Sequence, residues 1–199
     1  MKPLTPLFMI SGLFISSLMM GQTEELKQKL SAFAADHDAS YEKKYLNIAD
    51  REIGSIDNTS YSWKDEFMLK SKEKAMNNLG NNSYQKFYFS FYAYETVTDR
   101  KYALKDWMAD FIEGKSIRAG RPVRKYDYAT PTIILINDTE IMVCNYKCSD
   151  FSDDNFKYWR KTLLTYFGED NTMVIEIGCN GPLEWTKNAP DPKNRREMP

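Results

Sequence analysis

The hydrophobic pattern in the first part of the chain predicts helices. Over residues 23–56 the apolar positions follow helical spacing, with a break at 36–38. Residues 62–79 carry a more ragged apolar stripe, and Gly80 follows as a stop signal. The apolar positions are Leu26, Leu30, Phe33, Ala34, Tyr41, Tyr45, Ile48 and Ala49 in the first range, and Trp63, Phe67, Leu69, Ala75, Met76 and Leu79 in the second.

The period changes at Tyr84, where an aromatic and β-branched run predicts one long strand over 84–97. Phe87, Phe89, Phe91 and Ala93 share one face of it, and Tyr88, Ser90, Tyr92 and Tyr94 share the other. Further along, periodicity and turn signals predict a helix over 100–113, strands over 132–136 and 140–146, a helix over 153–167 and a strand over 173–177.

This order of elements predicts an α+β domain over residues 83–185 with a ferredoxin-like βαββαβ topology. Its sheet would be antiparallel, both helices would cover one face, and the last strand would lie beside the first. Residues 22–82 would form a helical N-terminal extension. Residues 186–199 contain three prolines and mixed charge, which predicts a flexible tail.

A second fold is suggested by Thr130-Pro131-Thr132-Ile133-Ile134-Leu135-Ile136-Asn137-Asp138, followed by a strand and a closing helix. This segment of about 40 residues resembles the second half of a thioredoxin-like α/β fold, in which a cis proline precedes such a strand. The redox Cys-x-x-Cys motif of that family is missing here. A proline also precedes strands simply because it cannot sit inside one, so the ferredoxin-like prediction is preferred.

The first 21 residues are typical of a secretory signal peptide. Lys2 supplies the positive start, Leu4–Met20 is mostly apolar, and Gly21 is the small residue before the expected cut. We therefore expect a secreted or periplasmic protein. After the signal peptide is removed, no apolar run is long enough to span a membrane.

An oxidising compartment changes the interpretation of the three cysteines, because two of them are then expected to pair. Cys144 and Cys148 lie four residues apart on an extended segment, which is too far to bridge. Cys148 and Cys179 each follow the end of a predicted strand and form the expected disulfide. Cys144 lies among apolar residues and is expected to be buried.

The amino-acid composition of the chain argues against several classes of function. Twenty-seven basic and 28 acidic side chains give a net charge of −1, without the basic excess of a nucleic-acid-binding protein. The single histidine, His37, excludes a multi-histidine metal site and is expected to be exposed in a helix break. The chain has only nine glycines and no phosphate-loop motif, so we predict neither a cofactor nor a metal.

Two surfaces are candidates for binding a partner. Tyr88, Tyr92 and Tyr94 share a strand face and would offer rigid contact area with hydroxyl groups, although the same rings also fit a second core layer covered by the N-terminal helices. The basic loop over 115–130 would suit an acidic partner, although such loops are usually only solvated. Its candidate binding residues are Arg118, Arg121, Arg124 and Tyr126.

These features predict a non-enzymatic binding protein with a protein partner, and a toxin-immunity or enzyme-inhibitor protein is the specific version. A secreted hydrolase is the alternative, because carboxylates that converge only in the fold leave no local motif. A structural protein of the cell envelope that works as an oligomer is a third. A deep pocket with clustered acids of perturbed pKa would favour the hydrolase, and a flat aromatic or charged patch would favour the binding protein.

Overall fold

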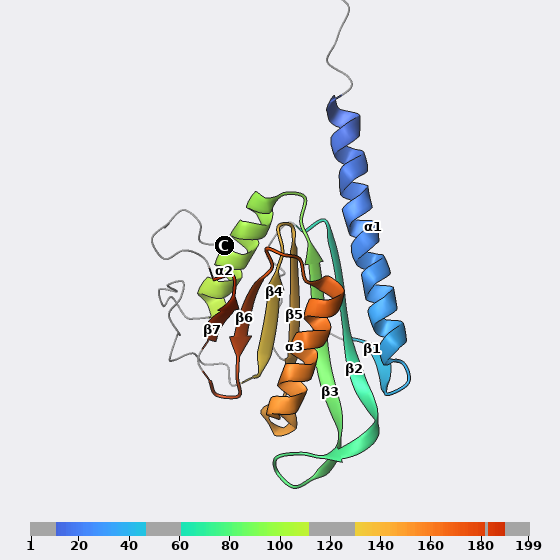
Figure 1. Ribbon diagram of the computed structural model, residues 1–199, viewed down its shortest axis with the longest axis vertical. Helices are drawn as coiled ribbons and strands as arrows, with labels where there is room; N and C mark the ends of the chain where they lie inside the picture. The colour runs from blue at the N-terminus through green and yellow to red at the C-terminus, as the bar shows by residue number, and fades with distance from the viewer. Residues whose placement is uncertain (1–10, 47–60, 112–129, 182, 190–199) are drawn as a thin grey trace, which may run out of the picture.

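The computed structural model describes residues 11–46, 61–111, 130–181 and 183–189. Within them, three α-helices pack on one sheet of seven strands (Figure 1). The elements are α1 Ser11–His37, β1 Tyr41–Tyr45, β2 Trp63–Met76, β3 Asn82–Ala93, α2 Val97–Phe111, β4 Thr132–Ile136, β5 Glu140–Tyr146, η2 Cys148–Asp150 (a 3₁₀ turn), α3 Asp153–Phe167, β6 Met173–Ile177 and β7 Leu183–Lys187.

The sheet confirms the α+β class but not the ferredoxin-like order of strands. Its order is β1-β2-β3-β5-β4-β6-β7, and every neighbouring pair is antiparallel. In the ferredoxin-like order β6 would pair with β3, whereas here it pairs with β4. The thioredoxin-like alternative is not supported either, because no described peptide bond is cis and no described pair of neighbouring strands is parallel.

The direction of the second crossover decides where the helices lie. The connection through α2 passes from β3 over β5 to β4, and the connection through α3 passes from β5 over β4 to β6. Both connections step toward the same edge, but they start from strands that run in opposite directions. Right-handed crossovers then put α2 and α3 on opposite faces. The expectation that both helices cover one face is therefore wrong.

The first face of the sheet is covered by α1 and α3 and is rich in aromatic rings. Trp159 of α3 is fully buried, with its ring 4.8 Å from that of Phe87 and 5.1 Å from that of Phe89 between centroids. The remaining buried side chains of this core include Leu26, Leu30 and Phe33 of α1, Phe67 and Leu69 of β2, Phe91 of β3, and Leu163 and Phe167 of α3. The strand faces predicted from the Phe87–Ala93 alternation are confirmed.

His37 joins α1 to α3 and is buried, so the expectation of an exposed histidine is wrong. Its ring stacks on Trp159 at 5.3 Å between centroids. Nδ1 lies 2.6 Å from the Phe33 carbonyl oxygen, and Nε2 lies 3.1 Å from the Tyr158 hydroxyl. A carbonyl only accepts hydrogen bonds, so Nδ1 donates to Phe33, and Nε2 forms a second hydrogen bond with the Tyr158 hydroxyl.

Two of the predicted helices are strands. Residues 62–79 contain β2 instead of a helix, and the piece beginning at Tyr41 contains β1. In β2 the buried Phe67 and Leu69 lie two residues apart with the less buried Met68 between them, which is the period of a strand. Within the described residues of the expected helical extension over 22–82, only those of α1 are helical, because β1 and β2 belong to the same sheet as the rest.

The C-terminal end of the described chain extends the sheet. β7 pairs with β6, Leu183 is fully buried, and Trp185 packs against the second core. Residues 186 and 187 of the expected flexible tail lie in β7, and residues 190–199 of that expected tail lie outside the described residues. None of the helices searched in the described residues is both long enough and apolar enough to cross a bilayer.

Candidate functional site

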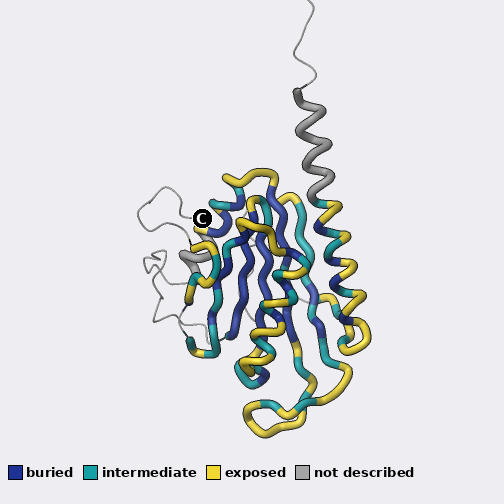
Figure 2. Tube along the Cα trace, viewed as in Figure 1, coloured by how far each residue is buried: buried dark blue, intermediate teal, exposed yellow. Residues whose placement is uncertain are grey.

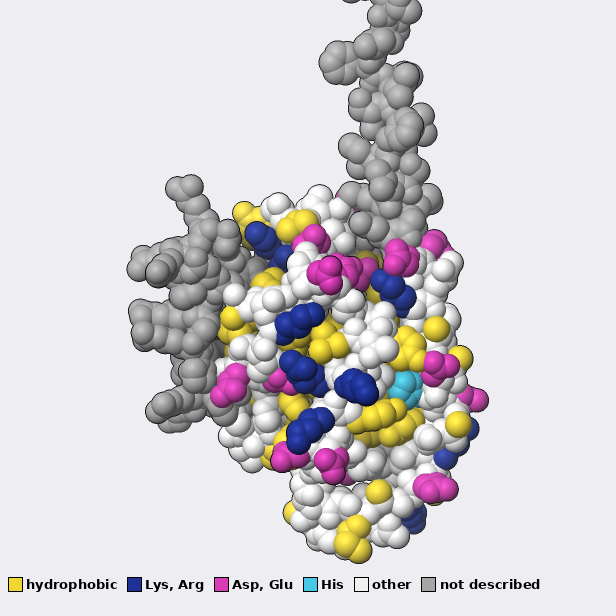
Figure 3. Space-filling model, in the orientation of Figure 1, with side chains coloured by type: hydrophobic (Ala, Val, Ile, Leu, Met, Phe, Trp, Pro, Cys, Tyr) yellow, Lys and Arg dark blue, Asp and Glu magenta, His cyan; other side chains and the backbone are white. Residues whose placement is uncertain are grey.

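The β2–β3 hairpin carries exposed apolar side chains at its closed end. Met76 is 77% exposed and Leu79 is 72% exposed, and Tyr84 on β3 is also exposed. This end extends beyond the helices as an exposed turn in Figure 2, and Figure 3 shows hydrophobic side chains on it. A folded chain gains nothing by exposing two adjacent aliphatic side chains, so this position is the first candidate for a contact surface.

Positive charge follows the two strands that lead to these apolar residues. Residues 70–86 contain four lysines and one acid, Glu73. Lys70 and Lys74 hold their ammonium groups 4.3 and 5.5 Å from the centroid of the Tyr84 ring. We call this group of residues the tip surface: Met76, Leu79 and Tyr84 with Lys70, Lys72, Lys74 and Lys86.

The turn between the two strands is built by asparagine and glycine. The side-chain oxygen of Asn77 accepts hydrogen bonds from the backbone N–H groups of Leu79 at 3.0 Å and Asn81 at 2.9 Å. Gly80 has a φ of 76°, in the left-handed region that favours glycine. The Asn77 side chain therefore fixes the backbone of the turn on which Leu79 lies and which follows Met76.

Asn78 attaches the turn to the segment that precedes α3. Its side-chain amide donates to the Phe151 carbonyl at 2.5 Å and to the Cys148 carbonyl at 3.4 Å. Its backbone N–H donates to the Ser149 carbonyl at 2.8 Å. The tip surface is therefore fixed to the body of the protein at a point 70 residues further along the chain, which lowers the entropy cost of binding.

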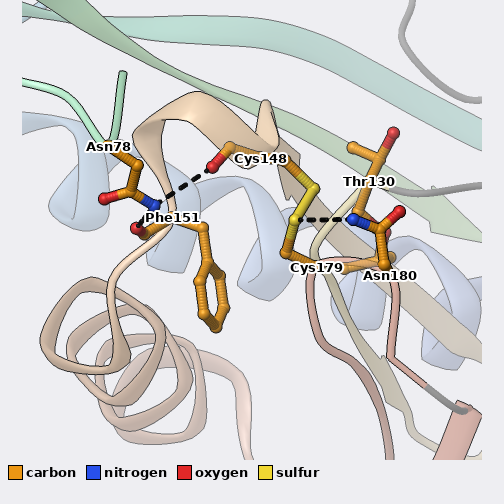
Figure 4. The surroundings of a disulfide bond; sticks show 7 residues. Asn78, Thr130, Cys148, Phe151, Cys179 and Asn180 are labelled. Atoms are coloured by element: carbon orange, nitrogen blue, oxygen red, sulfur yellow. Dashed lines mark hydrogen bonds between the residues drawn. A yellow bond between two sulfur atoms is a disulfide. The ribbon is translucent and has the colours of Figure 1, made fainter. Parts of the chain in front are cut away.

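The predicted disulfide lies directly behind this attachment (Figure 4). Cys148 and Cys179 are bonded, with Cα atoms 5.3 Å apart, so their pairing is confirmed. Both cysteines follow the ends of strands, as expected, but the strand that lies between those two strands differs from the expected one. β5 and β6 run parallel on either side of β4, whereas the ferredoxin-like order would have placed β3 between them. Cys144 is buried and unpaired, as expected.

Asp150 makes a second link between η2 and the hairpin. Its carboxylate is buried and accepts a hydrogen bond from the backbone of Lys86 on β3. Burial raises the pKa of Asp150, and the charges of Lys147 and Lys86 oppose that rise. The segment after β5 thus contacts the hairpin both at the turn and on its returning strand.

The opposite end of the same two strands borders a cavity. It has a volume of about 390 Å³ and lies where β2 begins and β3 ends, against α1 and the β4–β5 turn. Its carboxylates are Glu24, Glu95 and Glu140, and its single ammonium group is that of Lys27. The remaining lining residues of this end cavity are Thr23, Ser62, Trp63, Ala93, Tyr94 and Thr139.

The end cavity has an excess of negative charge. Lys27 is paired with Glu24, with 2.6 Å between Nζ and Oε1. Glu140 accepts a hydrogen bond from the Asn137 side chain at 3.2 Å. Burial raises the pKa of Glu140, and the nearby charges of Glu169 and Glu25 raise it further. Figure 3 shows Asp and Glu side chains gathered at this end of the molecule.

The predicted tyrosine surface lies inside the protein. Tyr88, Tyr92 and Tyr94 are 6%, 1% and 4% exposed. Tyr92 and Tyr94 belong to the second core, with Ala103 and Leu104 of α2. The cover is thus α2, not the N-terminal helices, and a binding role for these rings stays a prediction. The basic-loop residues Arg118, Arg121, Arg124 and Tyr126 lie outside the described residues.

The sequence does not reveal the tip surface, because its pattern predicts a helix over 62–79 with Gly80 as its stop and a separate strand from Tyr84. Asn77-Asn78-Leu79-Gly80-Asn81-Asn82 is rich in turn-forming residues and precedes the alternating run of β3, so it is also the signature of a turn between strands. Among the residues that the structure describes, no three His, Cys, Asp or Glu side chains are grouped as metal ligands would be.

No family model, curated protein or solved structure matches the chain.

Proposed function

We propose that this chain is a secreted or periplasmic binding protein without enzymatic activity, and that the tip surface is where it meets a protein partner. The observation that carries the proposal is the exposure of Met76 and Leu79 on a turn that Asn77 and Asn78 hold rigid. An apolar centre with a polar rim is the usual anatomy of a protein interface, and methionine is enriched there. An immunity or inhibitor protein that blocks a toxin or enzyme is the specific form.

Affinity capture from the native host tests this proposal. The bait is the purified chain, and the comparison is a Met76→Ser/Leu79→Ser variant, with captured proteins quantified by mass spectrometry. A matched control replaces two exposed residues of α2, Val97→Ser/Tyr102→Ser. We expect one partner at a stoichiometric level, reduced about tenfold or more in the tip variant and unchanged in the control. A partner that both variants capture equally would place the contact elsewhere.

The hydrolase alternative has one observation in its favour, the end cavity. Three carboxylates line it, and Glu140 has a raised pKa, as expected for a general acid. A screen of hydrolase substrates would test it with Glu140→Gln as the comparison. Turnover by the wild-type chain that Glu140→Gln abolishes would favour the enzyme over the binding protein.

A further inference from the structure

The two ends of the β2–β3 hairpin have opposite chemistry. The tip surface presents Met76 and Leu79 among lysines. The end cavity presents carboxylates around a hollow to which Trp63 and Tyr94 contribute. One end is apolar and positive, and the other is a partly aromatic hollow with negative charge. Such a pair is complementary in both shape and charge.

We infer that the tip surface of one copy of this chain docks in the end cavity of a second copy. This inference rests on the proposed function, since it uses the same tip surface and names a partner for it. Lys74, two residues before Met76 on β2, would lie near Glu95 and Glu24 of the second copy. Attraction between exposed groups of this kind orients the two molecules as they meet.

The size of the end cavity fits this occupant. An apolar cavity of about 150 Å³ already holds a benzene molecule. The end cavity has about 390 Å³ and is therefore large enough for the side chains of Met76 and Leu79 together. Burial and the nearby carboxylates disfavour the ionised form of Glu140 by raising its pKa, and incoming lysines would favour that form again.

One copy cannot make this contact with itself. β2 is 14 residues long, which places the tip surface roughly 40 Å from the end cavity at about 3.3 Å per residue.

Docking leaves one tip surface and one end cavity unused at the two ends of a pair. A contact between different surfaces of identical chains is heterologous and continues into rows or rings. A protein partner on the tip surface would then compete with this assembly.

Analytical ultracentrifugation of the purified chain tests the inference, with the N-terminus of the sample read from its intact mass. Contacts of small area are weak, so concentrations should extend to about 500 µM. We expect the average mass to rise with concentration and to pass the mass of a dimer. Sodium chloride at about 0.5 M should reduce the association, because the contact includes exposed charges.

Two variants block the two ends separately. Met76→Ser/Leu79→Ser removes the apolar part of the tip surface, and Glu95→Lys reverses a charge at the end cavity. Each should weaken self-association about tenfold or more. An equimolar mixture of the two variants should form pairs, because the intact tip surface of the Glu95→Lys variant can dock in the intact end cavity of the other variant. These pairs should not grow, because the surfaces left unused are the two altered ones. Val97→Ser/Tyr102→Ser and Glu184→Lys are the matched controls, and thermal melts establish that all variants are folded.

Each outcome decides between this inference and the alternatives. A wild-type chain that stays monomeric at every concentration overturns the inference, as does association that neither variant weakens. If the monomeric chain still captures a different protein through Met76 and Leu79, the proposed function stands and only the inference fails. If the chain assembles as expected but captures nothing else, the immunity or inhibitor form fails and the inference stands.

Discussion

Asn78 in the β2–β3 turn donates its side-chain amide to the backbone carbonyl of Phe151, 73 residues away, at 2.5 Å. This contact joins the most exposed apolar part of the described chain to the segment that the disulfide holds. Neither residue belongs to a sequence motif. The contact exists because η2 directs the chain across the end of the hairpin before α3 begins at Asp153.

Replacing Asn78 by alanine should release the turn without unfolding the domain. The variant loses two side-chain hydrogen bonds at an exposed site, so the expected cost is about 1 kcal/mol of unfolding free energy. Hydrogen exchange at residues 76–82 should become faster, whereas exchange in β4 and β5 should not change. Asn82→Ala in the same hairpin is the matched control. Equal exchange in both variants would mean that Asn78 does not fix the turn.

The sequence predicts the second half of the fold better than the first, and particular residues show why. Strands β4, β5 and β6 and helix α3 have strong local signals, including the Ser152 cap, which accepts a hydrogen bond from the backbone N–H of Asn155 at 3.1 Å. β2 has only Phe67 and Leu69 as fully buried residues, and Lys70, Lys72 and Lys74 fill the positions around them. Its strand identity therefore comes from pairing with β3, which no local pattern encodes.

The candidate site depends even more on contacts between distant segments. The positions of Cys148 and Cys179 after two strands predict their pairing, and the structure confirms it. The tip surface and the end cavity could not be predicted, because both follow from the β2–β3 hairpin that was assigned to a helix and a strand. Once that hairpin is known, Asn77 to Asn82 become a turn and the charges of residues 70–86 gather at one end.

His37 should contribute to stability by holding α1 on α3. His37→Ala removes the ring that stacks on Trp159 and leaves a gap in the aromatic core. We expect a loss of about 2–4 kcal/mol. Tyr158→Phe removes only the hydroxyl and should cost about 1 kcal/mol. Urea unfolding of both single variants and the double variant measures the coupling.

The double variant should be less destabilised than the sum of the two single variants, because the hydrogen bond is lost in each of them. Tyr102→Phe on α2, an exposed tyrosine, is the control for loss of a hydroxyl and should leave the unfolding free energy unchanged. Strict additivity of His37→Ala and Tyr158→Phe would show that the 3.1 Å contact contributes nothing.

Glu140 should make the stability of the protein depend on pH. Burial raises its pKa above the ordinary value of 4.5, so the folded state keeps the proton at pH values where the unfolded state has lost it. Above the folded pKa, the folded state must hold a buried charge, which costs stability. Glu140→Gln removes that cost and can still accept the hydrogen bond from Asn137.

The gain from Glu140→Gln should therefore be largest at neutral pH and should disappear as the pH falls to about 4. Melting temperatures of the wild type and the variant across pH 4 to 8 measure it. Glu73→Gln, at an exposed position on β2, is the matched control and should show no such trend. A gain that is equal at pH 4 and pH 7 would have to come from something other than the charge.

The disulfide should stabilise the protein only under oxidising conditions and should also keep the tip surface in place. Cys148→Ser should cost about 2–4 kcal/mol without reductant, and much less when the wild type is reduced as well. Cys144→Ser is the contrasting variant, because it puts a hydroxyl into the apolar core and should cost the same with and without reductant. In Cys148→Ser, hydrogen exchange at residues 76–82 should also speed up, since Asn78 is bound to the segment that the disulfide anchors. If exchange in the turn stays as slow as in the wild type, the attachment of Asn78 to Phe151 does not need the disulfide.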